Sequence, residues 1–181
     1  MTTTKSYTLA IMHIYPQLVP FQDFSVFQDA TGTQTVKWNN NNTQPTQAQL
    51  DSAWFEVLKK QKKDELDAKC DAIIMSGFTS SALGTAHTYP SDFQAMVFFN
   101  ATINRFNNDS TFTTANQKTV DAGYLAHTKT QFIQVFNDGH AFGESQIAHL
   151  NSLKAQVDAI TYSSDPTTQA TNQSNLDAIT W

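Results

Sequence analysis

Two histidines and a glutamate near residue 144 have the types and the spacing of metal ligands on a helix. His140 and Glu144 stand four positions apart, and His149 follows five positions after Glu144. Imidazole and carboxylate groups bind metal ions such as zinc, and a separation of four residues places two of them on one helical face. A lone pair of this kind is more typical of a solvated helix surface. We therefore expect no bound metal.

No set of residues in the sequence is typical of a catalytic centre. A nucleophile elbow requires the pattern G-x-S-x-G, which the chain does not contain. The serines of Ser76-Gly77 and Ser80-Ser81 have no predicted base beside them, and the 6 glycines form no glycine-rich phosphate loop. Because catalysis needs several convergent polar groups, we expect a protein that is not an enzyme and that uses no cofactor.

The remaining candidates for chemistry also favour structural roles. His87 and His127 flank predicted strand or helix ends, where local hydrogen bonding is the more common role of a histidine. Cys70 is the only cysteine, which excludes an internal disulfide and a cysteine-based zinc site. It is more typical of a small buried apolar residue.

The charge of the chain argues against binding to nucleic acid. The formal net charge is −5 at pH 7, and 15% of the residues are charged. The main lysine cluster, Lys59–Lys63, is followed directly by Asp64-Glu65, so no basic face is visible. No apolar run approaches the roughly 18 residues of a membrane span, and residues 1–5 open no signal peptide. We expect a soluble protein that is made in a cytoplasm and binds neither nucleic acid nor membrane.

The first half of the chain predicts a short helix, a β-hairpin and a long helix. The apolar stretch 7–14 is expected to be helical, and the β-rich runs 24–29 and 34–38 should pair as a hairpin. A capping box at 46–49, in which a Thr and a Gln side chain bond each other's backbone N–H groups, should begin a helix. This helix is expected to extend from about residue 47 to 76.

The middle of the long helix is predicted to join two modules. Residues 59–65 are almost all charged, whereas apolar residues recur on either side of them. A helix that is polar all round usually bridges two packed bodies. We therefore divide the chain into an N-terminal module, 1–58, and a C-terminal domain, 59–181.

The C-terminal domain is expected to continue with alternating hairpins and helices. A hairpin is predicted at 78–89, and a second capping box at 91–94 should begin another helix. Residues 111–113 and 119–126 have the composition of short strands, the second of which is broken by Gly123.

A ladder of apolar residues predicts one long helix near the C-terminus. Apolar residues recur at spacings of three and four over 132–160, after a third capping box at 128–131. Gly139 and Gly143 interrupt the ladder at a cost of about 1 kcal/mol each, and they would allow another backbone to come close. With a last short helix within 165–181, the elements predict a helix-rich α+β fold in which small antiparallel β-hairpins pack with long helices.

Aromatic residues and the glycines of the ladder are the candidates for a partner interface. Phe98 and Phe99 are neighbours on one helix, so they cannot face the same core. Either they pack on different layers, or one of them covers an intermolecular surface together with Trp38 or Phe27. The apolar ladder is longer than this domain needs, so part of it should be free to bind another copy of the chain, in a homo-oligomer, or a different subunit. We therefore expect Gly139→Leu to weaken association more than folding. The candidate interface residues are Phe27, Trp38, Phe98, Phe99, Phe136, Gly139, Phe142 and Gly143.

Motifs along nearly the whole chain resemble two families of phage proteins. A domain of unknown function from phage tail-fibre gene clusters is similar to Gly77–Gly84 with His87-Thr88-Tyr89, to His127–Val135 and to Asn175–Trp181. The XkdW-like family of small prophage tail-region proteins resembles the chain at Tyr15-Pro16, Asp23-Phe24, Val26, Gln28-Asp29, Trp38-Asn39 and Pro45-Thr46. The chain departs from that family at Asn40-Asn41-Asn42, where relatives tend to carry Leu-Pro. Neither family has an established catalytic residue that could be transferred.

The resemblance implies a bacteriophage protein with a structural role. It is expected to be a non-enzymatic tail protein, made in the host bacterial cytoplasm, that acts in the virion tail as a small adaptor of the tail-fibre or baseplate region by binding other tail proteins. The alternative is a tail-fibre assembly chaperone that is absent from the finished virion. A cell-wall-degrading tail enzyme should show a metal or carboxylate constellation, which the sequence does not contain.

Overall fold

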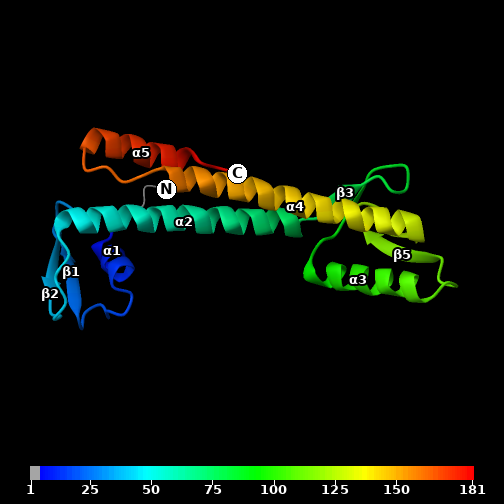
Figure 1. The fold of residues 1–181 in the computed structure, drawn as a ribbon, viewed down its shortest axis with the longest axis horizontal. Helices are drawn as coiled ribbons and strands as arrows, with labels where there is room; N and C mark the ends of the chain where they lie inside the picture. The colour runs from blue at the N-terminus through cyan, green and yellow to red at the C-terminus, as the bar shows by residue number, and fades with distance from the viewer. Residues whose placement is uncertain (1–4) are drawn as a thin grey trace. The chain divides into compact units, whose positions relative to one another are not determined.

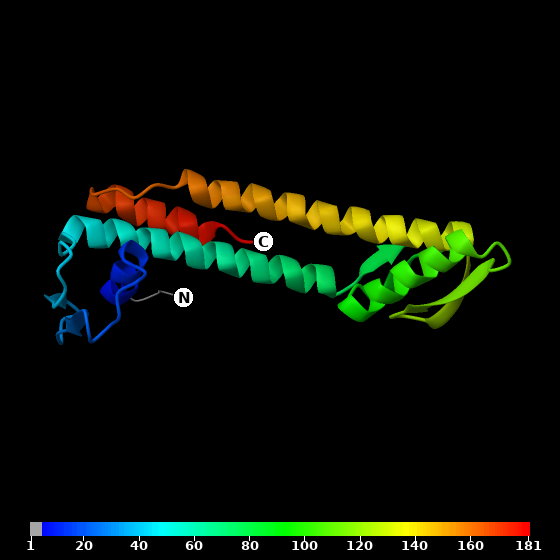
Figure 2. The same cartoon turned by 60° about the horizontal axis from the view of Figure 1, so that its bottom comes forward.

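The structure, a computed structural model, describes residues 5–181, which form five α-helices and three two-stranded antiparallel sheets (Figures 1 and 2). The expectation that the chain opens with no signal peptide falls mainly on residues 1–4, which lie outside the described residues. The chain divides into two compact units. Unit 1 comprises the residues up to Glu65 and 154–180, and unit 2 comprises 66–153 and Trp181. The predicted α+β fold class is confirmed.

Unit 1 begins with the helix and the hairpin that the sequence predicts. Helix α1 covers Tyr7–Ile14, and strands β1, Phe24–Gln28, and β2, Gln34–Trp38, pair antiparallel along their whole length. The Asp29 carboxylate accepts two backbone N–H groups of the turn between the strands, at 2.8 and 2.9 Å. The Thr31 hydroxyl donates to the same carboxylate at 2.6 Å and makes the largest contribution to lowering the pKa of Asp29, and the backbone bonds lower this pKa further.

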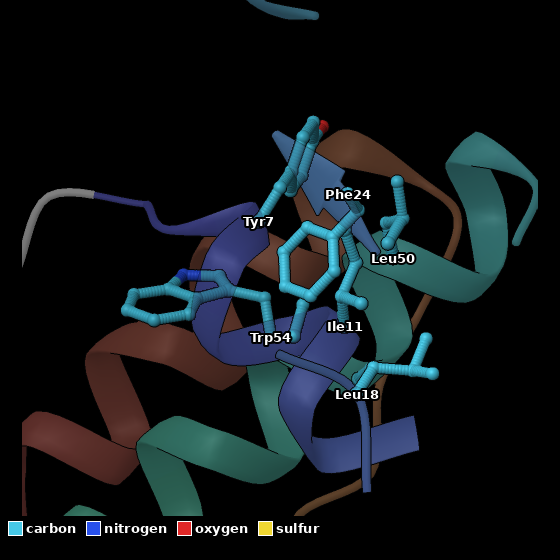
Figure 3. Packing of buried hydrophobic residues seen from close by; sticks show 8 residues of the cluster. Tyr7, Ile11, Leu18, Phe24, Leu50 and Trp54 are labelled. Carbon is cyan, nitrogen blue, oxygen red and sulfur yellow. The ribbon is translucent and has the colours of Figure 1, made fainter. Parts of the chain in front are cut away.

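Helix α2, Gln47–Met75, begins at the predicted capping box. The Thr46 N–H donates to the Gln49 amide oxygen at 2.8 Å, and the Gln49 N–H donates to the Thr46 hydroxyl at 3.3 Å. Below this cap, the first turns of α2 cover α1 and the hairpin, and the side chains of all three meet in one apolar cluster (Figure 3). The buried members of this cluster are Tyr7, Ala10, Ile11, Leu18, Phe24, Leu50, Ala53 and Trp54.

The charged stretch of α2 is not exposed on every side, because it is partly covered within unit 1. Lys59 is only 8% exposed, and its ammonium group lies 3.5 Å from the backbone carbonyl of Asp158. Lys63 forms an ion pair with the Asp158 carboxylate, near the end of helix α4, Lys129–Ala159. The predicted division of the chain at 58/59 concerns sequence modules and stays a prediction. The compact units separate elsewhere, at 65/66 and 153/154.

Helix α5, Pro166–Ala178, completes unit 1. Its N-cap is Asp165, whose carboxylate accepts the Thr168 N–H at 2.7 Å, and proline occupies the first turn, where no backbone donor is needed. The segment before α5 packs on α2 through Phe55 and Tyr162, whose ring centroids are 6.4 Å apart.

Unit 2 contains two small hairpins, one complete helix, the end of α2 and the greater part of α4. The first hairpin, β3, Phe78–Ser80, with β4, His87–Tyr89, lies where the sequence predicts it. It is followed by α3, Phe93–Asn108, and by a second hairpin of β5, Thr114–Thr119, and β6, Gly123–Thr128.

Three sequence predictions in this unit are wrong. The N-cap of α3 is Asp92, which accepts the Ala95 N–H at 2.9 Å, whereas the Ser91 hydroxyl donates to the Ile74 carbonyl instead of capping α3. Residues 111–113 are not a strand, because the Asp109 carboxylate accepts the N–H and hydroxyl of Thr111 and so holds this segment in a turn. Gly123 does not break a strand but begins β6, with a φ of 76° that suits glycine after the turn.

The core of unit 2 is aromatic and lies between α3, α4 and the hairpins. Helix α4 begins at the predicted third capping box, formed by Thr128 and Gln131, and runs unbroken through both glycines. Phe132, at its start, is fully buried, with ring centroids 5.3 Å from Phe99 and 5.5 Å from Phe106. The buried cluster consists of Phe78, Tyr89, Phe99, Phe106, Ala115, Phe132 and Val135.

Candidate functional site

The apolar ladder of α4 is buried at its start but opens in its middle. Phe132 and Val135 are fully buried, whereas Ile147 is 50% exposed. The intervening turns form one wall of a groove of about 250 Å³ in unit 2. The end of α2, strand β3 and the first turns of α3 supply the other walls. The large apolar side chains that line the groove are Ile74, Phe78, Met96, Phe99, Phe136, Phe142 and Ile147.

The two glycines of α4 both line the groove, but they have different surroundings. A Cβ atom on Gly143 would meet nothing within 4 Å, so this glycine leaves open space. A Cβ atom on Gly139 would lie 2.6 Å from Cζ of the Phe78 ring. The close approach predicted at Gly139 therefore exists, but a side chain of the same chain makes it. Because of this contact, Gly139→Leu should weaken the fold itself, whereas its effect on association stays a prediction.

The polar end of the groove contains the pair that sequence spacing singled out as metal ligands. His140 Nδ1 lies 3.5 Å from a Glu144 carboxylate oxygen, and both side chains are well exposed. His149 does not join them, because its ring packs edge-on against Trp181 at a centroid distance of 4.8 Å. Within residues 5–181, no group of three or more His, Cys, Asp or Glu side chains is arranged to hold a metal ion.

The predicted interface residues do not form one surface. Phe136, Gly139, Phe142 and Gly143 meet in the groove. Phe98 is 48% exposed and lines a different pocket, whereas Phe99 is 1% exposed and belongs to the core, so the two neighbours pack on different layers. In unit 1, Phe27 is exposed on β1, whereas Trp38 is half-buried, stacks on Phe24 and donates its indole N–H to the Asn42 carbonyl at 2.7 Å.

A buried histidine–tyrosine pair is the feature of unit 2 that sequence reasoning missed. His127 and Tyr89 are both fully buried, and the Tyr89 hydroxyl lies 2.8 Å from His127 Nε2. His127 Nδ1 lies 2.8 Å from the Leu125 carbonyl, which can only accept, so Nδ1 carries the proton and Nε2 accepts from Tyr89. Burial lowers the pKa of His127 and raises that of Tyr89. The alternation of inward-facing and outward-facing side chains along a strand was the sequence signal that could have placed His127 inside.

This pair predicts a loss of stability in mild acid. Because the folded pKa of His127 is depressed, below about pH 6.5 the unfolded chain binds a proton that the folded chain does not. The free energy of unfolding should therefore fall between pH 7 and pH 5, by at most about 1.4 kcal/mol per pH unit from this residue. Denaturant unfolding at several pH values measures the slope. His127→Gln should flatten it, whereas the exposed-site control His13→Gln should not; an unchanged slope in His127→Gln would contradict the assignment.

His87 makes the expected local hydrogen bond, with its Nε2 atom 3.2 Å from the Thr85 hydroxyl, and it also makes a long-range one. Its Nδ1 lies 2.8 Å from the Asp121 carboxylate, across 34 residues of sequence, and the other Asp121 oxygen accepts the Thr88 N–H at 3.0 Å. These bonds lower the pKa of Asp121, with the largest contribution from His87. Since the Val120 N–H also donates to the Thr88 carbonyl, the turn of the second hairpin is fixed to β4.

None of the helices in the described residues is long and apolar enough to cross a membrane. Cys70 is buried, which confirms its interpretation as a small buried apolar residue.

Comparison with known proteins identifies two sequence modules. The model of the domain of unknown function DUF4376 matches residues 57–179, and the model of the XkdW protein family matches residues 7–62. The "Phage-like element PBSX protein XkdW" of Bacillus subtilis (strain 168) is 42% identical over 50 residues, which are 28% of this chain and 46% of that protein. The matched region thus spans less than half of that relative. No solved structure matches the chain. The chain belongs to the DUF4376 family and, with its N-terminal XkdW-like module, is a phage-associated protein.

Proposed function

We propose that this protein is a non-enzymatic adaptor of the phage tail, in the tail-fibre or baseplate region, that binds another tail protein in the groove of unit 2. The observation that carries the proposal is an open apolar groove walled by four phenylalanine rings: Phe78, Phe99, Phe136 and Phe142. Concave apolar sites of this kind accept the anchoring side chains of a partner helix or loop.

The surroundings of the groove support a protein partner. Met75, Phe93 and Val97, on the same helices that wall the groove, are exposed although they are large and apolar. Exposed apolar residues beside a polar rim are typical of protein–protein interfaces. The His140 and Glu144 side chains lie on this rim and supply polar groups there. The similarity to XkdW, a phage-like element protein, supports a partner encoded by the same phage.

Filling the groove tests this proposal. Gly143→Trp should leave the fold intact, because a Cβ atom there meets nothing within 4 Å, and should reduce partner binding by at least about ten-fold, or 1.4 kcal/mol. Tagged wild-type and variant proteins, purified from phage-producing cells, can be compared by quantitative mass spectrometry of the co-purified tail proteins. Ala141→Trp is the matched control, since Ala141 is exposed on the same helix outside the groove.

Equal recovery of a tail protein by Gly143→Trp and by wild type would refute the groove as the binding site. If the tryptophan variant melts early, Ile147→Asp, at the exposed end of the groove, provides the same test. Purified particles distinguish the adaptor from the alternative, a tail-fibre assembly chaperone. Abundant peptides of this protein in the particles support the adaptor, and their absence supports the chaperone.

A further inference from the structure

A second pocket of unit 2 is lined by Gln117, a buried residue whose amide oxygen lacks a hydrogen-bond partner within the described residues. Gln117, on β5, is 2% exposed, and its Oε1 atom has no donor within the described residues. Its Nε2 atom donates to the Lys118 carbonyl at 3.4 Å, a long and weak bond. An unpaired buried acceptor destabilises a protein, and native structures contain few of them. A missing ligand is one physical reason for a native structure to contain an unpaired buried acceptor.

The walls of this pocket combine aromatic and polar side chains. It has a volume of about 280 Å³ and lies between the start of α3, the end of β4 and the β5–β6 hairpin. Phe98 is 48% exposed and Tyr124 is 70% exposed, so two aromatic rings border the space. Asp92, Gln94 and Lys118 line it as well and supply a carboxylate, an amide and an ammonium group.

The orientation of the Gln117 amide is set by its neighbour. Exchanging its nitrogen and oxygen would bring two oxygens together at the Lys118 carbonyl, so Oε1 is the atom left without a partner. The terminal torsion of a glutamine is soft, with broad minima. A donor placed in the pocket can therefore turn Oε1 toward itself and replace the weak bond with a normal one.

We propose that this pocket binds a single sugar ring. Sugar hydroxyls are donors for the Gln117 amide oxygen and for the Asp92 oxygen that does not cap α3, and acceptors for Lys118. The apolar C–H face of a sugar ring packs on exposed aromatic rings such as Phe98 and Tyr124. A volume of about 280 Å³ suits one ring rather than an oligosaccharide held end to end. An aliphatic ligand would leave the polar groups unpaired, and an anion would meet the Asp92 carboxylate.

Nuclear magnetic resonance of the 15N-labelled full chain tests this proposal directly. The probes are the methyl glycosides of glucose, galactose, mannose and N-acetylglucosamine, each titrated separately, with glycerol as a non-cyclic polyol. At least one glycoside should saturably shift the Gln117 side-chain amide and the neighbouring backbone amides, while Gly143, in the other groove, stays unshifted. Tyr124→Ala should weaken this binding at least about ten-fold, whereas Val120→Ala, at an exposed residue in the turn of the same hairpin, should not.

Gln117→Met supplies an independent readout. Methionine has a volume similar to that of glutamine and lacks the unpaired oxygen. This variant should therefore raise the melting temperature and abolish the glycoside shifts. Shifts of equal size in Tyr124→Ala, binding of glycerol as tight as that of the glycosides, or no saturable shift with any glycoside would overturn the proposal. These experiments use purified protein and free sugars, so their outcome is separate from that of the Gly143→Trp test for a tail partner.

Discussion

Replacing Phe132 with alanine is expected to lower the free energy of unfolding by about 3–5 kcal/mol. The ring is fully buried and lies in contact range of the rings of Phe99, Phe106 and His127. Its removal leaves a cavity between elements that the capping box of α4 and the second hairpin hold in place, so the surroundings cannot collapse freely. Equilibrium unfolding in urea, followed by circular dichroism, measures the loss.

Phe93→Ala is the matched control for this prediction. Phe93 is also a phenylalanine of unit 2, but its side chain is exposed, so its removal should change the free energy of unfolding by less than about 0.5 kcal/mol. Losses of similar size in the two variants would mean that the aromatic cluster is not the core that stabilises this unit.

The second large effect is expected from alanine at the two glycines of α4. Alanine favours a helix over glycine by about 1 kcal/mol, and Gly143→Ala should gain close to this amount because its Cβ meets nothing within 4 Å. Gly139→Ala should instead destabilise the protein by about 1–3 kcal/mol, because its Cβ would lie 2.6 Å from the Phe78 ring. The ring cannot move aside easily, since it is buried between Tyr89 and Phe99.

The pair of variants differs only in position on one helix, so the difference of their melting temperatures isolates the contact with Phe78. The double variant Gly139→Ala with Phe78→Leu should recover part of the loss, because leucine leaves room for the new methyl group. Equal stabilisation by both alanines would show that α4 does not press on β3 as the structure describes.

Local sequence patterns predicted the elements well wherever short-range bonds define them. The capping boxes that begin α2 and α4 are made within four residues, and both form as predicted. The capping box predicted at Ser91 does not form, because the serine hydroxyl donates to the Ile74 carbonyl, a tertiary partner. Asp92 caps α3 instead. The pattern alone could not reveal a competitor 17 residues away in the sequence.

The candidate site was predictable only in part. The open middle of the α4 ladder provides the side chains that periodicity singled out, including Phe136, Phe142 and Gly143. Phe78 and Met96, on the facing elements, escaped notice because nothing in their local patterns reveals what lies opposite. Gln117 escaped for the same reason, since a polar residue in a short strand appears solvent-facing until the hairpin is packed.

The burial of Cys70 gives this protein a natural reporter of its own opening. It is the only thiol of the chain, and its side chain is 2% exposed in α2. A thiol reagent in solution can react only when the surrounding structure opens, so the labelling rate measures that opening without any engineered cysteine. Mass spectrometry resolves labelled from unlabelled chains even in a mixture, and each variant described above can therefore be compared with wild type in one tube.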